Sequence, residues 1–127
     1  MLNIATQEKN NPQGILIRAI QPNQGIKIMQ NNRLKKEEFN LTNGPGKLME
    51  SFGIKNKSLN NTLLNYNNLK INLKEVKKPI QIIQGPRIGV SKGSSTLDPL
   101  RFFVKGNPYV SHILKTDTNI NYGWENS

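Results

Sequence analysis

A glycine-rich stretch, LTNGPGKL, contains the residue types most suited to holding a phosphate. Asn43 can cap a helix that begins at Pro45, and Lys47 then falls in the first turn of that helix. Amide groups at the helix start, together with the lysine, can bind one phosphate. The stretch is neither a P-loop, which needs Ser or Thr after the lysine, nor a dinucleotide-binding fingerprint. A plain Asn-Gly loop is an equally good interpretation.

An arginine inside an apolar run is the second unusual feature. Arg18 interrupts QGILIRAIQP, a β-branched segment that is typical of a strand. Burying a charge without a partner is costly, so the guanidinium must either reach solvent or meet a functional partner. The segment by itself leaves both interpretations open.

Residues for self-contained acid–base or metal chemistry are scarce. The chain has eight Asp and Glu residues, a single histidine, His112, and no cysteine. No carboxylates stand at a catalytic spacing in an apolar context, and Glu37 and Glu38 lie in a charged connector. We therefore expect no disulfide, no thiolate nucleophile, no intrinsic metal site and no cofactor.

The charge balance favours a polyanionic partner. Eighteen Lys and Arg residues against eight Asp and Glu residues give a net charge of +10. This surplus suits DNA, RNA or an anionic membrane surface, although a coding bias toward Lys and Asn explains part of it. The apolar runs are far shorter than the roughly 18 residues of a spanning helix, and no signal peptide is visible. We expect a cytoplasmic protein that does not attach to membranes.

Hydrophobic periodicity predicts the elements that must position these residues. The 127 residues suit one α+β domain in which strands outnumber helices. Strands are predicted at 13–22, 69–76, 80–90 and 100–104. Helices are predicted at 23–34, capped by Asn23, and at 45–52, ended by Gly53. Residues 58–68 suit another helical turn, and 116–127 form a polar, loosely ordered tail.

Four segments occur in an order that resembles the alkyladenine (3-methyladenine) DNA glycosylase family of base-excision repair. They are ILIRAIQPNQGIKIM, LTNGPGKL, PRIGVSKG and PLRFFVKGNPYVS. The resemblance implies a single α+β domain with a curved antiparallel sheet and peripheral helices. It also implies hydrolysis of the N-glycosidic bond of damaged purines, chiefly 3-methyladenine, with 7-methylguanine and hypoxanthine as further substrates. The implied enzyme needs no metal, uses water as its nucleophile, and flips the nucleotide out of duplex DNA.

The resemblance assigns roles to individual positions. Arg18 matches an arginine that holds the attacking water, and Ile88 matches the position whose backbone carbonyl accepts a hydrogen bond from that water. Asn3 matches an asparagine that discriminates among purine edges, and Leu16 matches a residue of the pocket wall. The positions that match DNA contacts are Asn43, Gly44, Lys47 and, more loosely, Lys55 and Lys57.

The resemblance also implies that part of the family pattern is missing. The family's general base is a glutamate, and its wedge residue is a tyrosine in a Y-G-M-Y-like segment, both upstream of the position of Met1. Glu8, Glu37 and Glu38 occur at the wrong points to replace that glutamate. We therefore expect residues 1–115 to be the C-terminal portion of a glycosylase domain, lacking its N-terminal part, with 116–127 as its tail.

Three functions follow as alternatives. The first is a monofunctional glycosylase acting on double-stranded DNA with alkylated or deaminated purines. As a monomer it would be weakly active or inactive alone, and a separate N-terminal half is a possible partner. The second is a non-catalytic, basic DNA-binding remnant of that family. The third is an unrelated RNA-binding module, which the low aromatic content of 6% disfavours.

Overall fold

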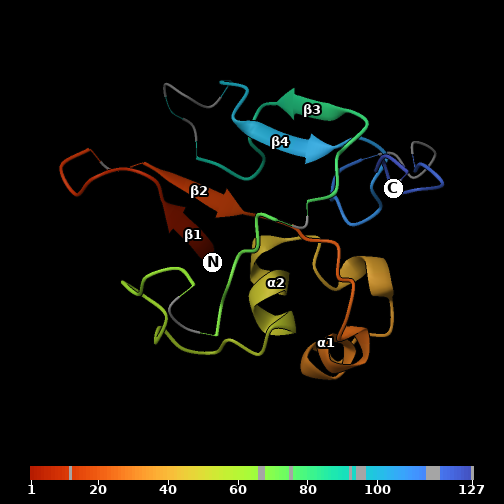
Figure 1. The fold of residues 1–127 in the computed structure, drawn as a ribbon, viewed down its shortest axis with the longest axis horizontal. Coiled ribbons are helices and arrows are strands. Elements are labelled where there is room, and N and C mark those ends of the chain that lie inside the picture. The colour runs from red at the N-terminus through yellow and green to blue at the C-terminus, as the bar shows by residue number, and fades with distance from the viewer. Residues whose placement is uncertain are drawn as a thin grey trace. The chain divides into compact units, whose positions relative to one another are not determined.

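The computed structural model describes residues 1–11, 13–65, 68–74, 76–91, 93, 97–113 and 118–126. Along the chain the elements are β1 (Leu2–Ala5), β2 (Gly14–Ile17), α1 (Ile26–Arg33), the 3-10 helix η1 (Glu38–Asn40), α2 (Pro45–Ser51), β3 (Ile82–Gly85) and β4 (Arg101–Val104) (Figure 1). The chain divides into two compact units, Met1–Ile71 and Asn72–Ser127. The predicted α+β class is confirmed, and the antiparallel pairing is distributed over two two-stranded sheets in the described part of the chain.

The first sheet is a hairpin of β1 and β2. The two strands pair antiparallel, with Asn3 opposite Leu16 and Ile4 opposite Ile15. The pairing extends one step further, because the amide of Thr6 donates to the carbonyl of Gln13 at 3.1 Å. The predicted strand at 13–22 is therefore confirmed in its first part, and it ends just before Arg18.

Helix α1 confirms the helix predicted at 23–34, but its ends differ from the expectation. It begins at Ile26 with Gly25 as N-cap, and no side chain caps it, so the prediction of Asn23 as cap is wrong. At the other end Leu34 adopts a left-handed conformation with φ 52°. The amide of Lys35 then donates to the carbonyl of Gln30 at 3.1 Å, which closes the helix in a Schellman arrangement.

Helix α2 begins at Pro45, as predicted, because proline is tolerated in the first turn. Its N-cap is Gly44 and not Asn43, whose side chain is instead engaged by Lys47. Gly53, with φ 69°, ends the helix as predicted. The amides of Gly53 and Ile54 donate to Glu50 and Met49, respectively, in a second Schellman motif.

The core of the first unit lies between α1 and the segment that runs into α2. Leu41 and Leu48 are fully buried, together with Thr42 and Ser51. Both buried hydroxyl groups are satisfied, since Thr42 Oγ1 donates to the Ile20 carbonyl and Ser51 Oγ donates to the Leu41 carbonyl, each at 2.7 Å. This small core anchors the glycine-rich loop on both sides.

The strand predicted at 69–76 is wrong. The described residues of 69–76 form no strand, and Leu73 is 80% exposed, so the alternating pattern there does not reflect a buried face. Asn72 Oδ1 accepts the amide of Lys74 at 2.9 Å, a local turn that competes with strand pairing. The described residues of 58–68 form turns, one of them closed by the amide of Asn60 on the Lys57 carbonyl.

The second unit is built on the β3–β4 pair, which confirms the strand predicted at 100–104 and, within 80–90, a strand at Ile82–Gly85; residues 86–90, after the turn, form no strand. Ile83 lies opposite Phe103, and Gly85 lies opposite Arg101. The guanidinium of Arg101 lies 4.2 Å above the centre of the Phe103 ring and donates to the Ser111 carbonyl at 2.7 Å.

The C-terminal segment is held against this sheet unit. Trp124 forms a β-bridge with Pro79, and the amide of Ile80 donates to the Gly123 carbonyl at 2.8 Å. The buried Asn107 donates to the Tyr122 carbonyl at 3.0 Å. The expectation of a loosely ordered tail is therefore wrong for residues 118–126, while 116, 117 and 127 lie outside the described residues.

Candidate nucleic-acid interface

The hairpin brings together two of the residues predicted for the base pocket. Asn3 in β1 lies directly opposite Leu16 in β2. Directly opposite residues of an antiparallel pair project from the same face, with Cβ atoms about 5 Å apart. Asn3 is exposed and Leu16 is half-buried, so the pair forms a patch with one polar and one apolar member.

Arg18 and Ile88 are the two positions predicted for the attacking water. Arg18 is half-buried and follows the last residue of β2, in the first unit. Ile88 is half-buried and lies shortly after β3, in the second unit. Arg18 stands two residues after Leu16, the spacing that keeps side chains on one face wherever the chain stays extended.

Lys47 is fixed by two asparagine side chains. Its Nζ atom donates to Asn40 Oδ1 at 2.5 Å and to Asn43 Oδ1 at 2.9 Å. Two of the three ammonium hydrogens are thereby directed into the loop. A Cβ atom at Gly44 would lie 3.5 Å from Lys47 Cδ, an ordinary contact, so the lysine stem passes close over the glycine. The predicted phosphate-binding group is therefore a partly buried, oriented cation.

Arg33 is a residue of this region that the sequence did not single out. Its side chain is only 8% exposed, and its Nε atom donates to Glu50 Oε2 at 3.0 Å. Its Nη1 atom donates to the carbonyls of Asn40 and Leu41. Arg33 thus links the end of α1 to the loop that holds Lys47. Its partners are too distant in the sequence for a local pattern to predict these contacts.

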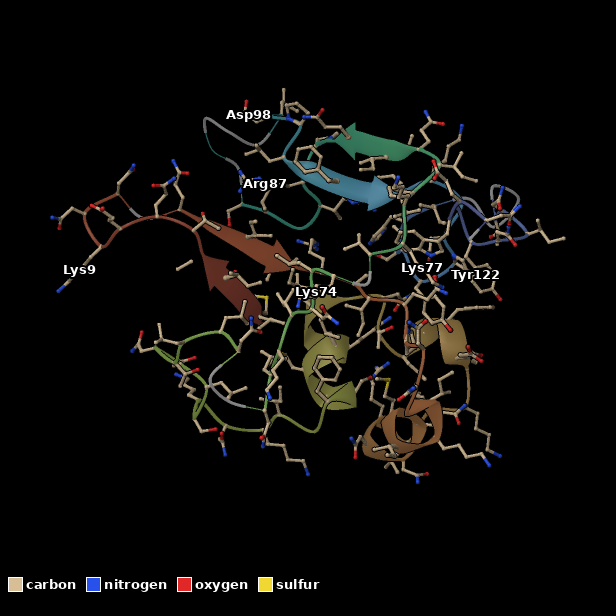
Figure 2. The ribbon with its side chains drawn as sticks, in the orientation of Figure 1. Lys9, Lys74, Lys77, Arg87, Asp98 and Tyr122 are labelled. Carbon is tan, nitrogen blue, oxygen red and sulfur yellow. The ribbon has the colours of Figure 1, made fainter. Side chains whose placement is uncertain are left out.

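The remaining predicted phosphate contacts lie on the surface. Lys55 and Lys57 are exposed in the segment after α2. Lys9 is exposed as well, and Figure 2 shows it at the outer end of the β1–β2 connection, extending away from the strands. The first unit carries ten Lys and Arg residues against four Glu residues. Its surface therefore attracts polyanions.

Carboxylates in the described part of the chain are all exposed: Glu8, Glu37, Glu38, Glu50, Asp98 and Glu125. Within the same residues, no three His, Asp or Glu side chains gather closely enough to hold a metal ion. No helix there has the length and apolar character needed to cross a membrane. The distinctive chemistry of the described surface is cationic.

Comparison with known proteins identifies the family. The model of the methylpurine-DNA glycosylase family matches residues 1–108. The chain therefore belongs to this family, as the four sequence segments predicted. The match includes Asn3, Leu16, Arg18, Lys47 and Ile88.

Individual relatives agree with the family match. A protein of Latilactobacillus sakei, assigned by name as a 3-methyladenine DNA glycosylase, is 46% identical over 98% of this chain and 59% of its own length. A relative with the same assigned name from Staphylococcus haemolyticus is 46% identical over 92% of this chain and 57% of its own length. Another, from Lactiplantibacillus plantarum, is 44% identical over 98% of this chain and 59% of its own length. The chain thus spans less than two thirds of the length of these relatives.

Proposed function

We propose that this chain takes part in DNA-3-methyladenine glycosylase activity, with residues 1–115 forming the C-terminal portion of the glycosylase domain. The substrate is double-stranded DNA that carries alkylated or deaminated purines. The family match and the names of the relatives support this reaction class. By itself the chain is weakly active or inactive, and a separate polypeptide that supplies the rest of the domain would raise its activity.

The observation that carries the proposal is the pairing of Asn3 with Leu16 across the hairpin. A purine flipped from the stack needs an apolar wall for its face and polar groups for its edge. Leu16 would supply the wall, and the Asn3 amide, which both donates and accepts hydrogen bonds, would read the edge. Arg18, two residues beyond Leu16, would then lie beside the sugar of the same nucleotide.

In the chemical step, the oxygen of a water molecule forms a bond to the sugar C1′ while the bond from C1′ to the purine nitrogen breaks. The electron pair of that bond leaves with the base, and an abasic site remains. The water passes a proton to a general base, a glutamate in the family pattern. In the family pattern, the position of Arg18 orients the water, and the position of Ile88 accepts a hydrogen bond from it through the backbone carbonyl. Alkylated purines are favoured because their positive charge makes them better leaving groups.

The duplex is held through its phosphates. The oriented ammonium of Lys47, beside Asn43 and Gly44, suits one backbone phosphate, and the exposed Lys55 and Lys57 suit neighbouring ones. Such contacts position the DNA without reading its sequence. They also make the affinity fall as the salt concentration rises.

A second function, non-catalytic DNA binding, is favoured by the exposure of every described carboxylate. A general base that activates water works best in an enclosed site, where its proton affinity is raised. The second function predicts the same salt-dependent duplex binding without release of any base.

The test is base release from a duplex that contains one hypoxanthine, measured by chromatography of the free base. We expect slow release by the unmodified chain and a loss of about 10²-fold or more in Arg18→Gln, the scale of a group that positions the attacking water. Lys9→Gln is the matched control, since Lys9 is an exposed cation at a loop end. Release of the base overturns the second function, duplex binding without release fits either the second function or an inactive first one, and absence of duplex binding at low salt overturns both.

A further inference from the structure

Asn43 and Gly44 place an asparagine side chain next to a glycine amide, two groups that can react with each other without an enzyme. No other asparagine of the chain is followed by a glycine. Glycine matters at the second position because it lacks the Cβ atom that would hinder contact between its backbone nitrogen and the preceding side chain. The pair lies in the loop before α2, and its reactivity plays no part in the proposed function.

The backbone nitrogen of Gly44 is the group that would attack. Gly44 has an extended conformation, with φ −165° and ψ 152°. No described residue accepts a hydrogen bond from its amide, so the attack breaks no hydrogen bond of the described fold. The atoms nearest to the position of an added Cβ belong to the Lys47 stem, at 3.5 Å and beyond. The fold therefore leaves this nitrogen available for reaction.

The side-chain carbonyl of Asn43 is the group that would be attacked, and Lys47 is placed to activate it. The Nζ atom of Lys47 donates to Asn43 Oδ1 at 2.9 Å, and a second bond to Asn40 Oδ1 holds the ammonium in place. A positively charged donor on a carbonyl oxygen stabilises the negative charge that develops there when a nucleophile adds to the carbon. The loop thus contains the nucleophile, the electrophile and an activating group.

We propose that Asn43 is a site of spontaneous deamidation in the folded chain, assisted by Lys47. The Gly44 nitrogen loses its proton to water and forms a bond to Cγ of Asn43. The bond from Cγ to Nδ2 then breaks, Nδ2 takes up a proton from water and leaves as ammonia, and a succinimide ring remains. Water adds to either carbonyl of the ring and opens it, which leaves aspartate or isoaspartate at position 43.

The reaction changes the charge beside the predicted phosphate contact. A carboxylate replaces the neutral amide that accepts from Lys47, so an ion pair neutralises the lysine and the new charge repels a phosphate. Isoaspartate also lengthens the backbone by one carbon just before α2. This consequence for DNA rests on the proposed function, whereas the chemical step does not.

Peptide mapping by mass spectrometry tests the chemical step on the purified chain, kept at physiological temperature and mildly alkaline pH. Deamidation raises the mass of a peptide by one unit, and isoaspartate elutes separately from aspartate. We expect Asn43 to be modified faster than any other asparagine, and faster as the pH rises, because the Gly44 nitrogen must lose its proton. Modification of other asparagines while Asn43 stays intact overturns the proposal.

Two variants separate the roles of the neighbouring residues. Gly44→Ala adds a Cβ that meets only ordinary contacts, and the extended backbone before Pro45 suits alanine, so the loop keeps its conformation. Its deamidation should be several-fold slower while its thermal unfolding stays unchanged. In Lys47→Met the reaction should be about tenfold slower, less than the loss of a donor costs in an enclosed site. An equal or faster rate in Lys47→Met overturns the assistance by Lys47.

Duplex binding tests the consequence of the modification. We expect the salt slope of binding to fall by about 1 in the deamidated chain, and Asn43→Asp to reproduce this loss without incubation. Asn23→Asp is the matched control, since it makes the same charge change at an exposed residue before α1. An unchanged slope in the deamidated chain refutes the effect on Lys47 and leaves the proposed function in place. If the fresh chain shows no salt-dependent duplex binding, the proposed function fails, whereas a mass gain at Asn43 still supports the deamidation.

Discussion

The backbone at Gly123 leaves no room for a side chain. Its φ is +81°, and a Cβ atom there would lie 2.1 Å from the Lys105 carbonyl oxygen and 2.8 Å from Val104 Cγ1. We expect Gly123→Ala to lower the free energy of unfolding by about 3 kcal/mol, because strain and overpacking act together. Urea denaturation followed by circular dichroism measures the loss. Gly85→Ala is the control, since a Cβ atom at Gly85 meets nothing within 4 Å. Equal stability of the two variants would show that the C-terminal segment does not pack as described.

Arg33 shows why basic residues are not interchangeable as candidate DNA contacts. We expect Arg33→Met to destabilise the chain by about 2–3 kcal/mol, because the carbonyls of Asn40 and Leu41 lose a buried donor. Glu50→Gln should cost less than about 1 kcal/mol, since Glu50 is 65% exposed and its ion pair is weakened by solvent. Thermal unfolding of both variants tests this difference. A larger loss in Glu50→Gln would indicate that the ion pair, and not the carbonyl bonds, fixes the loop.

The candidate site could be predicted residue by residue only where a local motif identifies a position. The family pattern indicated Arg18 and Lys47, and the match to residues 1–108 is consistent with that pattern. The role of Arg33 could not be predicted, because its acceptors Asn40, Leu41 and Glu50 come from a different part of the chain. The partners of Lys47 were missed because Asn43 was read as a helix cap, a role that depends on φ and ψ at Gly44.

The loop before α2 makes Lys47 both a structural residue and a candidate phosphate contact. We expect Lys47→Met and Lys55→Met each to reduce the salt slope of duplex binding by about 1, which is the effect of losing one phosphate contact. Only Lys47→Met should also lower stability, by about 1 kcal/mol, because Asn40 and Asn43 lose their common donor. Binding titrations at several salt concentrations, with thermal unfolding alongside, separate these effects. An unchanged slope in Lys47→Met would assign the lysine a structural role only.

Elements with strong local signals were predicted well. The proline at the start of α2 and the glycine after its end correctly predicted where that helix begins and ends. The apolar run before Gly106 correctly predicted strand β4. The predicted strand at 69–76 was wrong because alternation reports a preference for pairing and not the presence of a partner strand. Asparagine side chains satisfy nearby amides in that segment instead.

The second unit presents an apolar sheet face to solvent. Ile82 and Phe102 project from the same face of β3 and β4 and are 58% and 61% exposed, and Ile80 and Leu100 beside them are also exposed. Exposed apolar surface of this kind promotes association. We expect the isolated chain to aggregate at high concentration, and the double variant Ile82→Lys and Phe102→Lys to remain monomeric longer. Light scattering over a concentration series measures this, and identical scattering of both chains would show that this face does not drive association.

The bracing of the β3–β4 pair by the last described residues has a consequence during synthesis. Ile80 is translated well before Gly123, whose carbonyl it binds, and the amide of Glu125 binds the carbonyl of Lys78. The bonds that close the second unit therefore cannot form until Gly123 and Glu125 have left the ribosome. All partners of the Arg33 network have been synthesised by residue 50. Folding on the ribosome should thus be sequential, with the apolar strands of the second unit waiting longest for their neighbours.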